Sequence, residues 1–243
     1  MTQQQMYLVG HAIVAFLLAY ALSKKFRIGE VSFALAMLIA CLPDVDVLFQ
    51  SAGILLHKSY THSLILSLIA VPIVIFAIAK WRKVSAGAAF VYSMAYIQHI
   101  AIGDIAIGSM NILYPFGDMI AGSGIGYGTL VHQVLEFLLL AIAAAIVLGK
   151  SFGSKEERPD ATILFRYNRN DQISYLLLIG SLTISFVYLL YGIKVLPRFY
   201  IETNLELTIF VLLHLSTIAW MSFMALVAMQ HTILARNSVY GKS

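Results

Sequence analysis

The stretch YLVGHAIVAFLLAYALS, residues 7–23, is apolar apart from a single histidine and a serine, and KKFR follows it at residues 24–27. A run of about 20 apolar residues is long enough to cross the hydrocarbon core of a bilayer as a helix. The basic residues follow the run instead of preceding it, which is not the charge pattern of a cleavable signal peptide. We therefore expect this first segment to remain as a membrane-spanning helix.

The rest of the chain repeats this pattern. Of its 243 residues, 60% are hydrophobic and 12% are charged, and the mean hydropathy is +0.85. Such a composition excludes an ordinary soluble domain and predicts an all-α polytopic helix bundle. About seven segments are long enough to span, near residues 7–23, 28–48, 62–79, 86–107, 130–149, 173–193 and 205–231.

We expect three parts along the chain. Residues 1–150 form a five-helix membrane core, residues 151–172 form a charged cytoplasmic linker, and residues 173–243 add two further spans. The single cysteine, Cys41, excludes an internal disulfide and a thiolate cluster. The net charge of +4 needs no nucleic-acid partner, because basic residues in membrane proteins usually mark cytoplasmic loops.

The basic residues predict the orientation. Thirteen of the 16 lysines and arginines fall on one side of the seven expected spans, and three fall on the other. The positive-inside rule makes the first side cytoplasmic, which places the N-terminus outside and the C-terminus inside.

Histidines and acids gather where the segments end on the outer side. The residues concerned are His11, His57, His62, His99 and His132, with Asp44, Asp46, Asp104 and Asp118. Acids beside an apolar span are costly unless they are paired or functional. Histidines together with carboxylates suit zinc or a similar divalent ion. The sequence therefore predicts a shared metal site at the outer surface of the membrane.

The spacing of His99 and Asp104 leaves their relation open. Residues five apart on a regular helix turn their side chains about 140° from one another. Gly103 permits a kink or a bulge that would bring them together. Without such a bulge, the two side chains belong to different sides of the site.

Other polar positions have two interpretations. His132 and Glu136 share a helix face, and Glu136 either orients a ligating histidine or forms a structural pair with it. His214 is expected to be a hydrogen-bonded core residue, and Thr61 is a candidate N-cap of the third helix. The glycine-rich segment 108–129 is either a lid over the site or a linker.

At these positions the chain resembles the YdjM/YbcI family of membrane proteins, described as metal-dependent hydrolases. The resemblance covers about residues 6–150 and is carried by His11, LPDVD at 42–46, HKSYTHS at 57–63, the histidine–aspartate helix at 99–104 and YPFG at 114–117. Lys58 stands where the family usually has arginine, which keeps the charge but loses bidentate phosphate recognition. The family's histidine and aspartate in the fourth helix are more often four apart than five. The ligand order is also similar to that of zinc-dependent phospholipases C and single-strand nucleases.

The function expected from these residues is metal-dependent hydrolysis of a lipid head-group bond, with a phosphoester as the leading substrate. The expected metal ligands are His11, Asp44, His62, His99 and Asp104. Zinc is the favoured ion, manganese and iron are alternatives, and one to three ions fit. Asp46 is the expected general base or a bridge to a second metal, and His57 the leaving-group acid or a further ligand. Lys58, Thr61 and Ser63 are expected to hold the substrate anion.

Two other classes of function are less well supported. A metal- or proton-linked transporter needs polar groups along a path across the bilayer, and the inner halves of the expected helices are almost free of them. A structural or haem-binding protein would need histidines that face one another within the bundle, whereas most of these lie at its rim.

Overall fold

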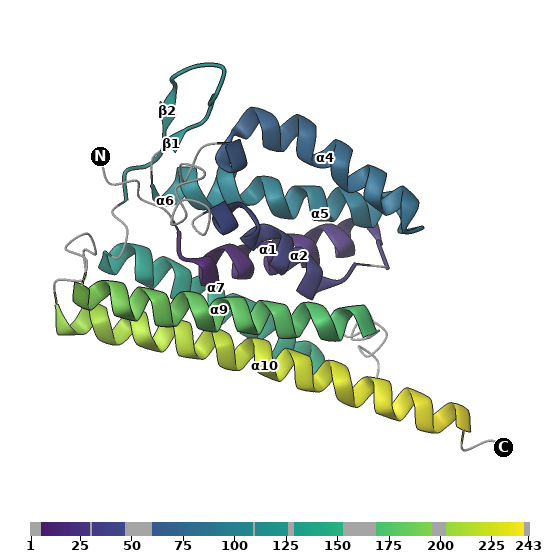
Figure 1. Ribbon diagram of the computed structural model, residues 1–243. Helices are drawn as coiled ribbons and strands as arrows, with labels where there is room; N and C mark the ends of the chain where they lie inside the picture. Colours follow the sequence, from purple (N-terminus) through teal and green to yellow (C-terminus); the bar gives the residue numbers. More distant parts are fainter. Residues whose placement is uncertain are drawn as a thin grey trace.

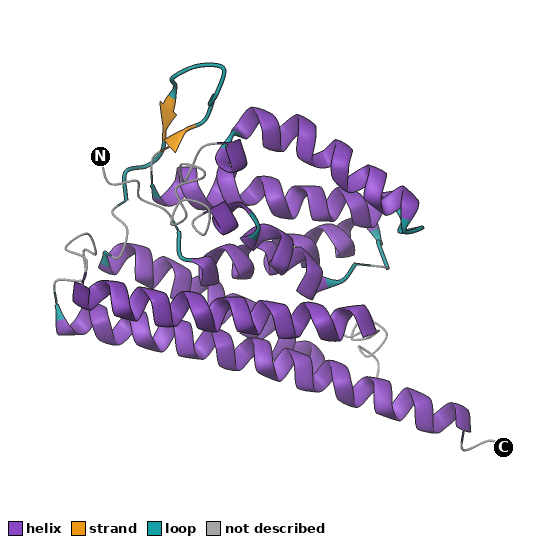
Figure 2. Cartoon of the chain, in the orientation of Figure 1, coloured by secondary structure: helices purple, strands orange, loops and turns teal. Residues whose placement is uncertain are grey.

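The computed structural model is a bundle of long helices with one small β-hairpin at one end (Figures 1 and 2). It describes residues 6–29, 31–46, 60–108, 110–125, 129–152, 169–195 and 203–240. Its main helices are α1 (Leu8–Phe26), α2 (Phe33–Cys41), α4 (Leu64–Trp81), α5 (Ala86–Gln98), α7 (Leu130–Phe152), α9 (Arg169–Val195) and α10 (Asn204–Tyr240). The expected all-α architecture is confirmed.

Six helices in the described part of the chain are long and apolar enough to cross a membrane. They are Leu8–Phe26, Leu64–Trp81, Ala86–Ile107, Leu130–Gly149, Gln172–Leu190 and Asn204–Val227. The expected segment 28–48 differs from the other six, because α2 has only nine residues, about 14 Å of helix. It gives way to the 3-10 turn η1 (Pro43–Val45), which starts at a proline. Residues 47 and 48 lie outside the described residues.

Helices α1 and α2 occupy the middle of the bundle (Figure 1). Helix α5 packs against both of them, with α4 on its outer side, while α7 packs on α1, α9 packs on α2, and α10 packs on α7 and α9. The central pair is rich in buried alanines: Ala12, Ala15, Ala19, Ala36 and Ala40. Small residues let helix backbones approach closely in a membrane. This tight centre is what brings the polar ends of α1, α2 and α5 together.

The outer face of α4 is apolar and exposed. Ile69, Ile73 and Val74 have 55–65% of their surface exposed. A patch of this kind is rare on soluble monomers, but hydrocarbon chains cover it in a bilayer. We therefore take this face of α4 as a lipid-facing surface.

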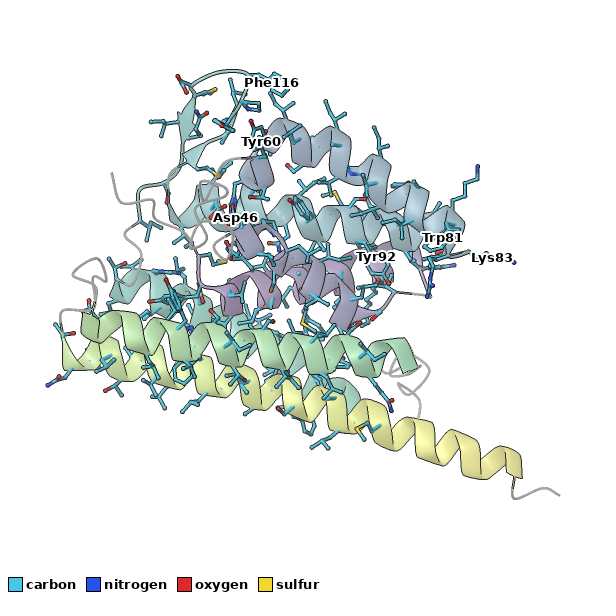
Figure 3. The ribbon with its side chains drawn as sticks, in the orientation of Figure 1. Asp46, Tyr60, Trp81, Lys83, Tyr92 and Phe116 are labelled. Atoms are coloured by element: carbon cyan, nitrogen blue, oxygen red, sulfur yellow. The ribbon has the colours of Figure 1, made fainter. Side chains whose placement is uncertain are left out.

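The two ends of the bundle differ in chemistry. Figure 3 shows Trp81 and Lys83 at one end and Asp46 with Tyr60 toward the other. Lys24 and Lys25 close the last turn of α1, where positive charge is favourable to the helix dipole. Lys24, Lys25 and Lys83, three of the basic residues that predict a cytoplasmic face, are therefore remote from Asp46.

Serine hydroxyl groups cap three helices. The capping residues are Ser32 before α2, Ser63 before α4 and Ser85 before α5, and each accepts a hydrogen bond from the N–H three residues later. Such a cap contributes about 1 kcal/mol. The expectation that Thr61 caps the third helix is wrong, because Ser63 holds that position.

The glycine-rich segment contains a hairpin. Strand β1 (Met110–Asn111) pairs antiparallel with β2 (Ile120–Ala121), and Met110 lies opposite Ala121. The backbone N–H of Leu64 donates to the carbonyl of Ile112, with 3.1 Å between N and O. The hairpin is thus attached to the start of α4, at the end of the bundle that carries Asp46 (Figure 3).

A buried glutamate joins the start of α1 to α7. The Glu136 Oε1 atom accepts a hydrogen bond from the Tyr7 N–H at 2.8 Å and lies 2.7 Å from His132 Nε2. The rings of Tyr7 and His132 stack with centroids 4.5 Å apart. Gly10 makes room, since a Cβ there would lie 2.5 Å from the Glu136 carboxyl group. A carboxylate at a helix N-terminus is favourable to the helix dipole, so Glu136 fixes the start of α1.

We expect Glu136→Ala to lower the melting temperature of the detergent-solubilised protein by several degrees. The substitution removes the acceptor shared by Tyr7 and His132, and losing a buried hydrogen-bond partner costs about 1–3 kcal/mol. Glu136→Gln keeps a carbonyl oxygen at this place and should lower the melting temperature much less. Equal losses in the two variants would show that the charge, and not the hydrogen bonding, holds this contact.

Candidate metal centre

Short turns carry polar side chains at the end of the bundle where α1 begins. The turn η1 carries Asp44, and the 3-10 turn η2 (Tyr60–His62) carries His62. The π-helix η3 (His99–Asp104) continues α5 and carries a histidine at its start and an aspartate at its end. His62, His99 and Asp104 are fully buried, while the side chain of Asp44 is 12% exposed. Four titratable groups are thus gathered inside an apolar bundle.

Two histidine nitrogens and two carboxylate oxygens converge there. The Nε2 atoms of His62 and His99 lie 3.2 Å apart. Asp44 Oδ1 lies 3.3 Å from His62 Nε2 and 3.5 Å from His99 Nε2. Asp104 Oδ2 lies 3.6 Å and 3.7 Å from the same two nitrogens. These are the donor types that bind zinc and similar divalent ions.

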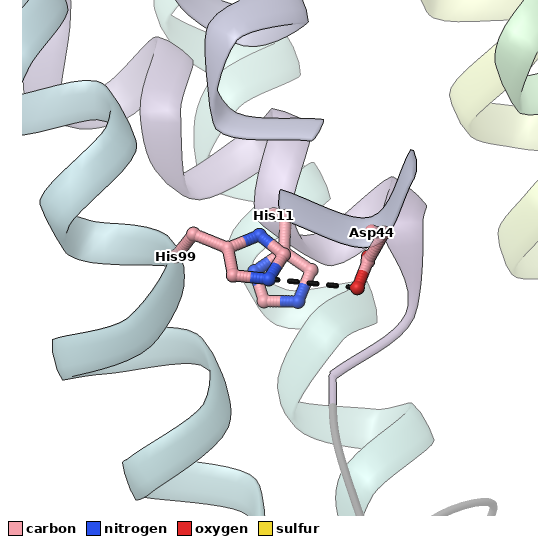
Figure 4. Close-up of side chains that lie close together, drawn as sticks. All are labelled: His11, Asp44 and His99. Atoms are coloured by element: carbon pink, nitrogen blue, oxygen red, sulfur yellow. Dashed lines mark ion pairs between the residues drawn. The ribbon is translucent and has the colours of Figure 1, made fainter. Parts of the chain in front are cut away.

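His11 adds a third imidazole from the first turn of α1. Its ring stacks on that of His99 with centroids 3.6 Å apart and planes 16° apart. Figure 4 shows the two rings together beside Asp44, which forms an ion pair with His99. His11, Asp44 and His99 form one group able to hold a metal ion, and His62, His99 and Asp104 form a second. All five expected ligands therefore lie together, in two groups that share His99.

The π-helix answers the question raised by the spacing of His99 and Asp104. Its wider turn puts residues five apart on one side, so that His99 Nε2 and Asp104 Oδ2 are 3.7 Å from each other. π-Bulges within α-helices frequently occur at functional sites. Gly103 lies within it, and a Cβ on this residue would overlap the ring of His11. The sequence allowed either a regular helix or a bulge here, and the structure has the bulge.

A backbone carbonyl orients His99. The Nδ1 atom of His99 lies 2.7 Å from the carbonyl oxygen of Ala40, in the last turn of α2. Since a carbonyl only accepts, Nδ1 carries the proton, and in the neutral ring the Nε2 lone pair faces the other ligands. Metal-binding histidines are commonly oriented by a second hydrogen bond of this kind.

Asp46 and Thr61 orient His62 in the same way. The Thr61 hydroxyl donates to Asp46 Oδ2 at 2.5 Å, and this oxygen is 3.3 Å from His62 Nδ1. The Tyr96 hydroxyl donates to the Thr61 carbonyl at 2.9 Å and attaches the turn to α5. Asp46 thus lies behind His62, which does not fit the expected role of a general base or a bridging ligand.

Of the expected anion-binding residues, Thr61 needs a similar correction. The Thr61 hydroxyl is already used by Asp46. Ser63 is fully buried, and its hydroxyl accepts the N–H of Leu66 as the cap of α4. The Thr61 proton is therefore not available to a substrate anion, whereas Ser63 keeps a hydroxyl proton to donate and its expected role remains a prediction. His57 and Lys58 lie outside the described residues, so their expected roles remain predictions.

Three other polar residues are not part of this centre. Asp118, which was expected on the outer side but not among the ligands, is exposed in the hairpin and accepts a hydrogen bond from Asn111 Nδ2 at 2.8 Å. His132 belongs with Glu136, as a structural pair that also contacts Tyr7. His214 donates from Nδ1 to the carbonyl of its own helix at Phe210, in line with its expected place in the core.

The sequence reasoning missed two groups that shape the centre. Tyr96 lies three residues before His99 and shares its helix face, so its spacing was a usable signal. The carbonyl of Ala40 has no signal in the sequence, because any residue there supplies the same oxygen.

The acids and histidines perturb one another's pKa. Asp44 and His62 both lie in short turns outside the six long apolar helices. Burial would raise the pKa of Asp44, but the charge interaction with His99 and hydrogen bonds from His62 and His99 hold this pKa well below its usual value. Burial would lower the pKa of His62, but hydrogen bonds to Asp44 and Asp46 outweigh it and raise the pKa to about 9. In metal-free protein at neutral pH, Asp44 is therefore ionised and His62 is protonated.

Gly103→Ala should lower the affinity for zinc at least tenfold, because the new methyl group displaces the ring of His11 from the centre. Gly180→Ala is the matched control, since a Cβ there meets nothing within 4 Å. Metal content after equilibrium dialysis measures the effect, and a melting curve shows whether each variant is folded. Full zinc binding by a folded Gly103→Ala variant would remove His11 from the ligand set.

Zinc binding should depend on pH. Because the pKa of His62 is raised to about 9, the ring must lose a proton to become a ligand. The apparent affinity should therefore rise as pH increases from 6 toward 9, by up to about tenfold per unit for one displaced proton. Calorimetry in buffers of different ionisation enthalpy measures the protons released. An affinity that stays constant over this range would contradict this arrangement.

The comparison with known proteins identifies the family. Residues 6–196 match the family model described as YdjM inner membrane protein, beyond the expected limit near residue 150 and including α9. No curated protein and no solved structure matches the chain. Because the match covers most of the chain and the structure has six apolar helices long enough to span, this multi-pass membrane protein belongs to the YdjM inner membrane protein family.

Proposed function

We propose that this protein is an integral-membrane, metal-dependent hydrolase that cleaves a phosphoester or another head-group bond of a membrane lipid. The observation that carries the proposal is the convergence of His62, His99, Asp44 and Asp104 at separations of 3.2–3.7 Å. A purely structural polar cluster would not require four ionisable groups at one point in an apolar bundle, where each buried charge is costly.

The separations support zinc as the ion. A regular tetrahedron with zinc–ligand bonds of about 2.0–2.1 Å separates its ligand atoms by about 3.3–3.4 Å. The five separations, 3.2–3.7 Å, lie around this value. Magnesium and calcium prefer sites built from oxygen ligands, which a pair of imidazoles disfavours. Manganese and iron remain the alternatives, and His11 offers a ligand for a second ion or an expanded coordination shell.

A divalent ion at this centre would polarise a phosphoryl oxygen and lower the pKa of a water molecule. Asp46 and the Ala40 carbonyl keep the two imidazoles aimed at the centre, and Gly103 leaves space for the third. Asp44 is the least buried member of the converging group, so the substrate is expected to approach from its side. His57 and Lys58 are the proposed acid and anion contacts.

The depth of the centre supports a lipid substrate. His11 lies three residues after the start of α1, about 5 Å from that end, and His99 lies 13 residues after Ala86, about 20 Å from the other end of α5. In a hydrocarbon core of about 30 Å, these distances place the centre about 5–10 Å beneath one surface. A lipid head group is already close to this level, whereas a soluble substrate has to leave water to reach it.

The basic residues support a centre that faces the periplasm or the exterior. Lys83 and Trp81 lie at the end of the bundle remote from Asp46 (Figure 3). If the positive-inside rule holds for this chain, the end with Lys83 is cytoplasmic and the metal centre is extracytoplasmic.

Asp104→Asn tests this proposal against Asp118→Asn. The first substitution removes a buried carboxylate from the converging group, and the second changes an exposed one in the hairpin. With zinc present, we expect hydrolysis of at least one member of a phospholipid panel to fall about 100-fold or more in Asp104→Asn and to stay within about twofold in Asp118→Asn.

Metal content is measured on the same preparations by mass spectrometry. Wild type and Asp118→Asn should hold at least one equivalent of zinc, manganese or iron, and Asp104→Asn should hold at least tenfold less. A wild-type protein that binds no metal after incubation with zinc would remove the metallohydrolase proposal. Metal binding without hydrolysis of any lipid in the panel would leave a metal site and reject the lipid substrate.

A further inference from the structure

An apolar groove runs along the bundle beside the metal centre. It lies between α1, α7 and the segment formed by η3 and α6 (Ile105–Ile107), and its volume is about 470 Å³. Every side chain that lines it is apolar. Val14 and Ile107 are buried in its floor, whereas Leu135 and Leu138 are 38% and 56% exposed on its walls. The groove therefore has a closed floor and an open side.

One end of the groove adjoins the metal centre. Its wall residue Ile102 immediately precedes Gly103 and Asp104 in the π-helix. Val14 follows His11 by three residues on α1 and lies about one turn further along the helix. The segments that carry three of the expected ligands, His11, His99 and Asp104, thus also build the groove.

The length of the groove matches one leaflet of a bilayer. Met6 lines it just before α1 and Leu18 lines it within α1; the ten helical steps from Leu8 to Leu18 correspond to about 15 Å at 1.5 Å each. Half of a hydrocarbon core of about 30 Å is about 15 Å. An apolar chain extending from the level of the metal centre toward the bilayer midplane would fill it.

We propose that this groove binds one acyl chain of the lipid whose head group lies at the metal centre. The inference rests on the proposed function and adds to it a basis for selecting the substrate by its chain. A chain enters sideways from the bilayer, because the groove is open on one side and its three walls belong to apolar helices long enough to span. Bulk lipid that exchanges freely along the surface is the competing occupant.

Val14→Phe and Val74→Phe form a matched pair for the test. Val14 is 7% exposed in the floor of the groove, so a phenyl ring there obstructs it partway along its length. Val74 is 55% exposed on the lipid-facing side of α4, outside the groove. Both variants are checked first for metal content and melting temperature against the wild type.

Photocrosslinking tests the groove without any need for hydrolysis. The protein is reconstituted in vesicles of phosphatidylethanolamine and phosphatidylglycerol, with a trace of phosphatidylglycerol that carries a diazirine in one acyl chain. Crosslinks to peptides covering residues 14–18, 102–107 and 135–139 should fall about tenfold in Val14→Phe and stay unchanged in Val74→Phe. Equal labelling of these peptides in all three proteins would indicate bulk lipid and overturn the proposal.

Hydrolysis then separates this inference from the proposed function. Long-chain and short-chain lipids with the same head group are compared as the ratio of their rates. Val14→Phe should lower the long-to-short ratio about tenfold, whereas Val74→Phe should not change it. An unchanged ratio in Val14→Phe, with activity present, rejects the groove and keeps the hydrolase. If wild type hydrolyses no lipid, the proposed function fails, and crosslinking alone decides whether the groove holds a chain.

Discussion

Buried negative charge at one end of an apolar bundle is the constraint on which the rest of the structure depends. Asp104 is fully buried and Asp44 nearly so. An ionised carboxylate out of water costs several kcal/mol unless a positive group compensates it. His62 supplies that partner, because its Nε2 atom lies within 3.6 Å of both carboxylates. A divalent cation between these groups and His99 would compensate the charge more completely than a shared proton does.

That constraint explains why so many other groups are used to fix the two histidines. His99 is held by the Ala40 carbonyl, and His62 by Asp46 with Thr61. The Tyr96 hydroxyl then fixes the turn that carries Thr61. A histidine that could rotate away would leave a buried carboxylate without its partner. The surrounding hydrogen bonds therefore maintain the charge balance as well as the geometry of a metal site.

Much of the centre could be predicted from the sequence because hydropathy fixes the level of each residue. Apolar runs show where helices begin and end. The end of one span and the start of the next lie on the same side of the membrane. His11, His62 and Asp104 come together for this reason, although they are far apart in the chain. The same reasoning does not decide which residues on that side join the centre: Asp118, in a hairpin beyond the helix ends, bonds locally to Asn111 instead.

The local backbone geometry could not be predicted from the sequence. The π-helix at residues 99–104 and the early end of α2 both change which residues face one another. Gly103 and Pro43 signalled that a change of geometry was possible there, without specifying which one. Asp46 and Thr61 were assigned to chemistry because their type and position suited it, but their hydrogen bonds show that they hold His62. Which atom of a polar residue faces inward depends on contacts that spacing does not encode.

The two C-terminal helices bear on how a lipid would reach the centre. Helix α9 packs on α2 and α10 packs on α7, and Leu178 and Phe210 join the same core as α1 and α2. They therefore cover one side of the central pair, while α5 covers another. No described residue of either C-terminal helix lines the groove between α1, α6 and α7. Among the described residues, the bundle is therefore left open on the side where α1 meets the π-helix, next to the metal centre. The bulge that brings Asp104 to His99 also shapes the wall along which an acyl chain would lie.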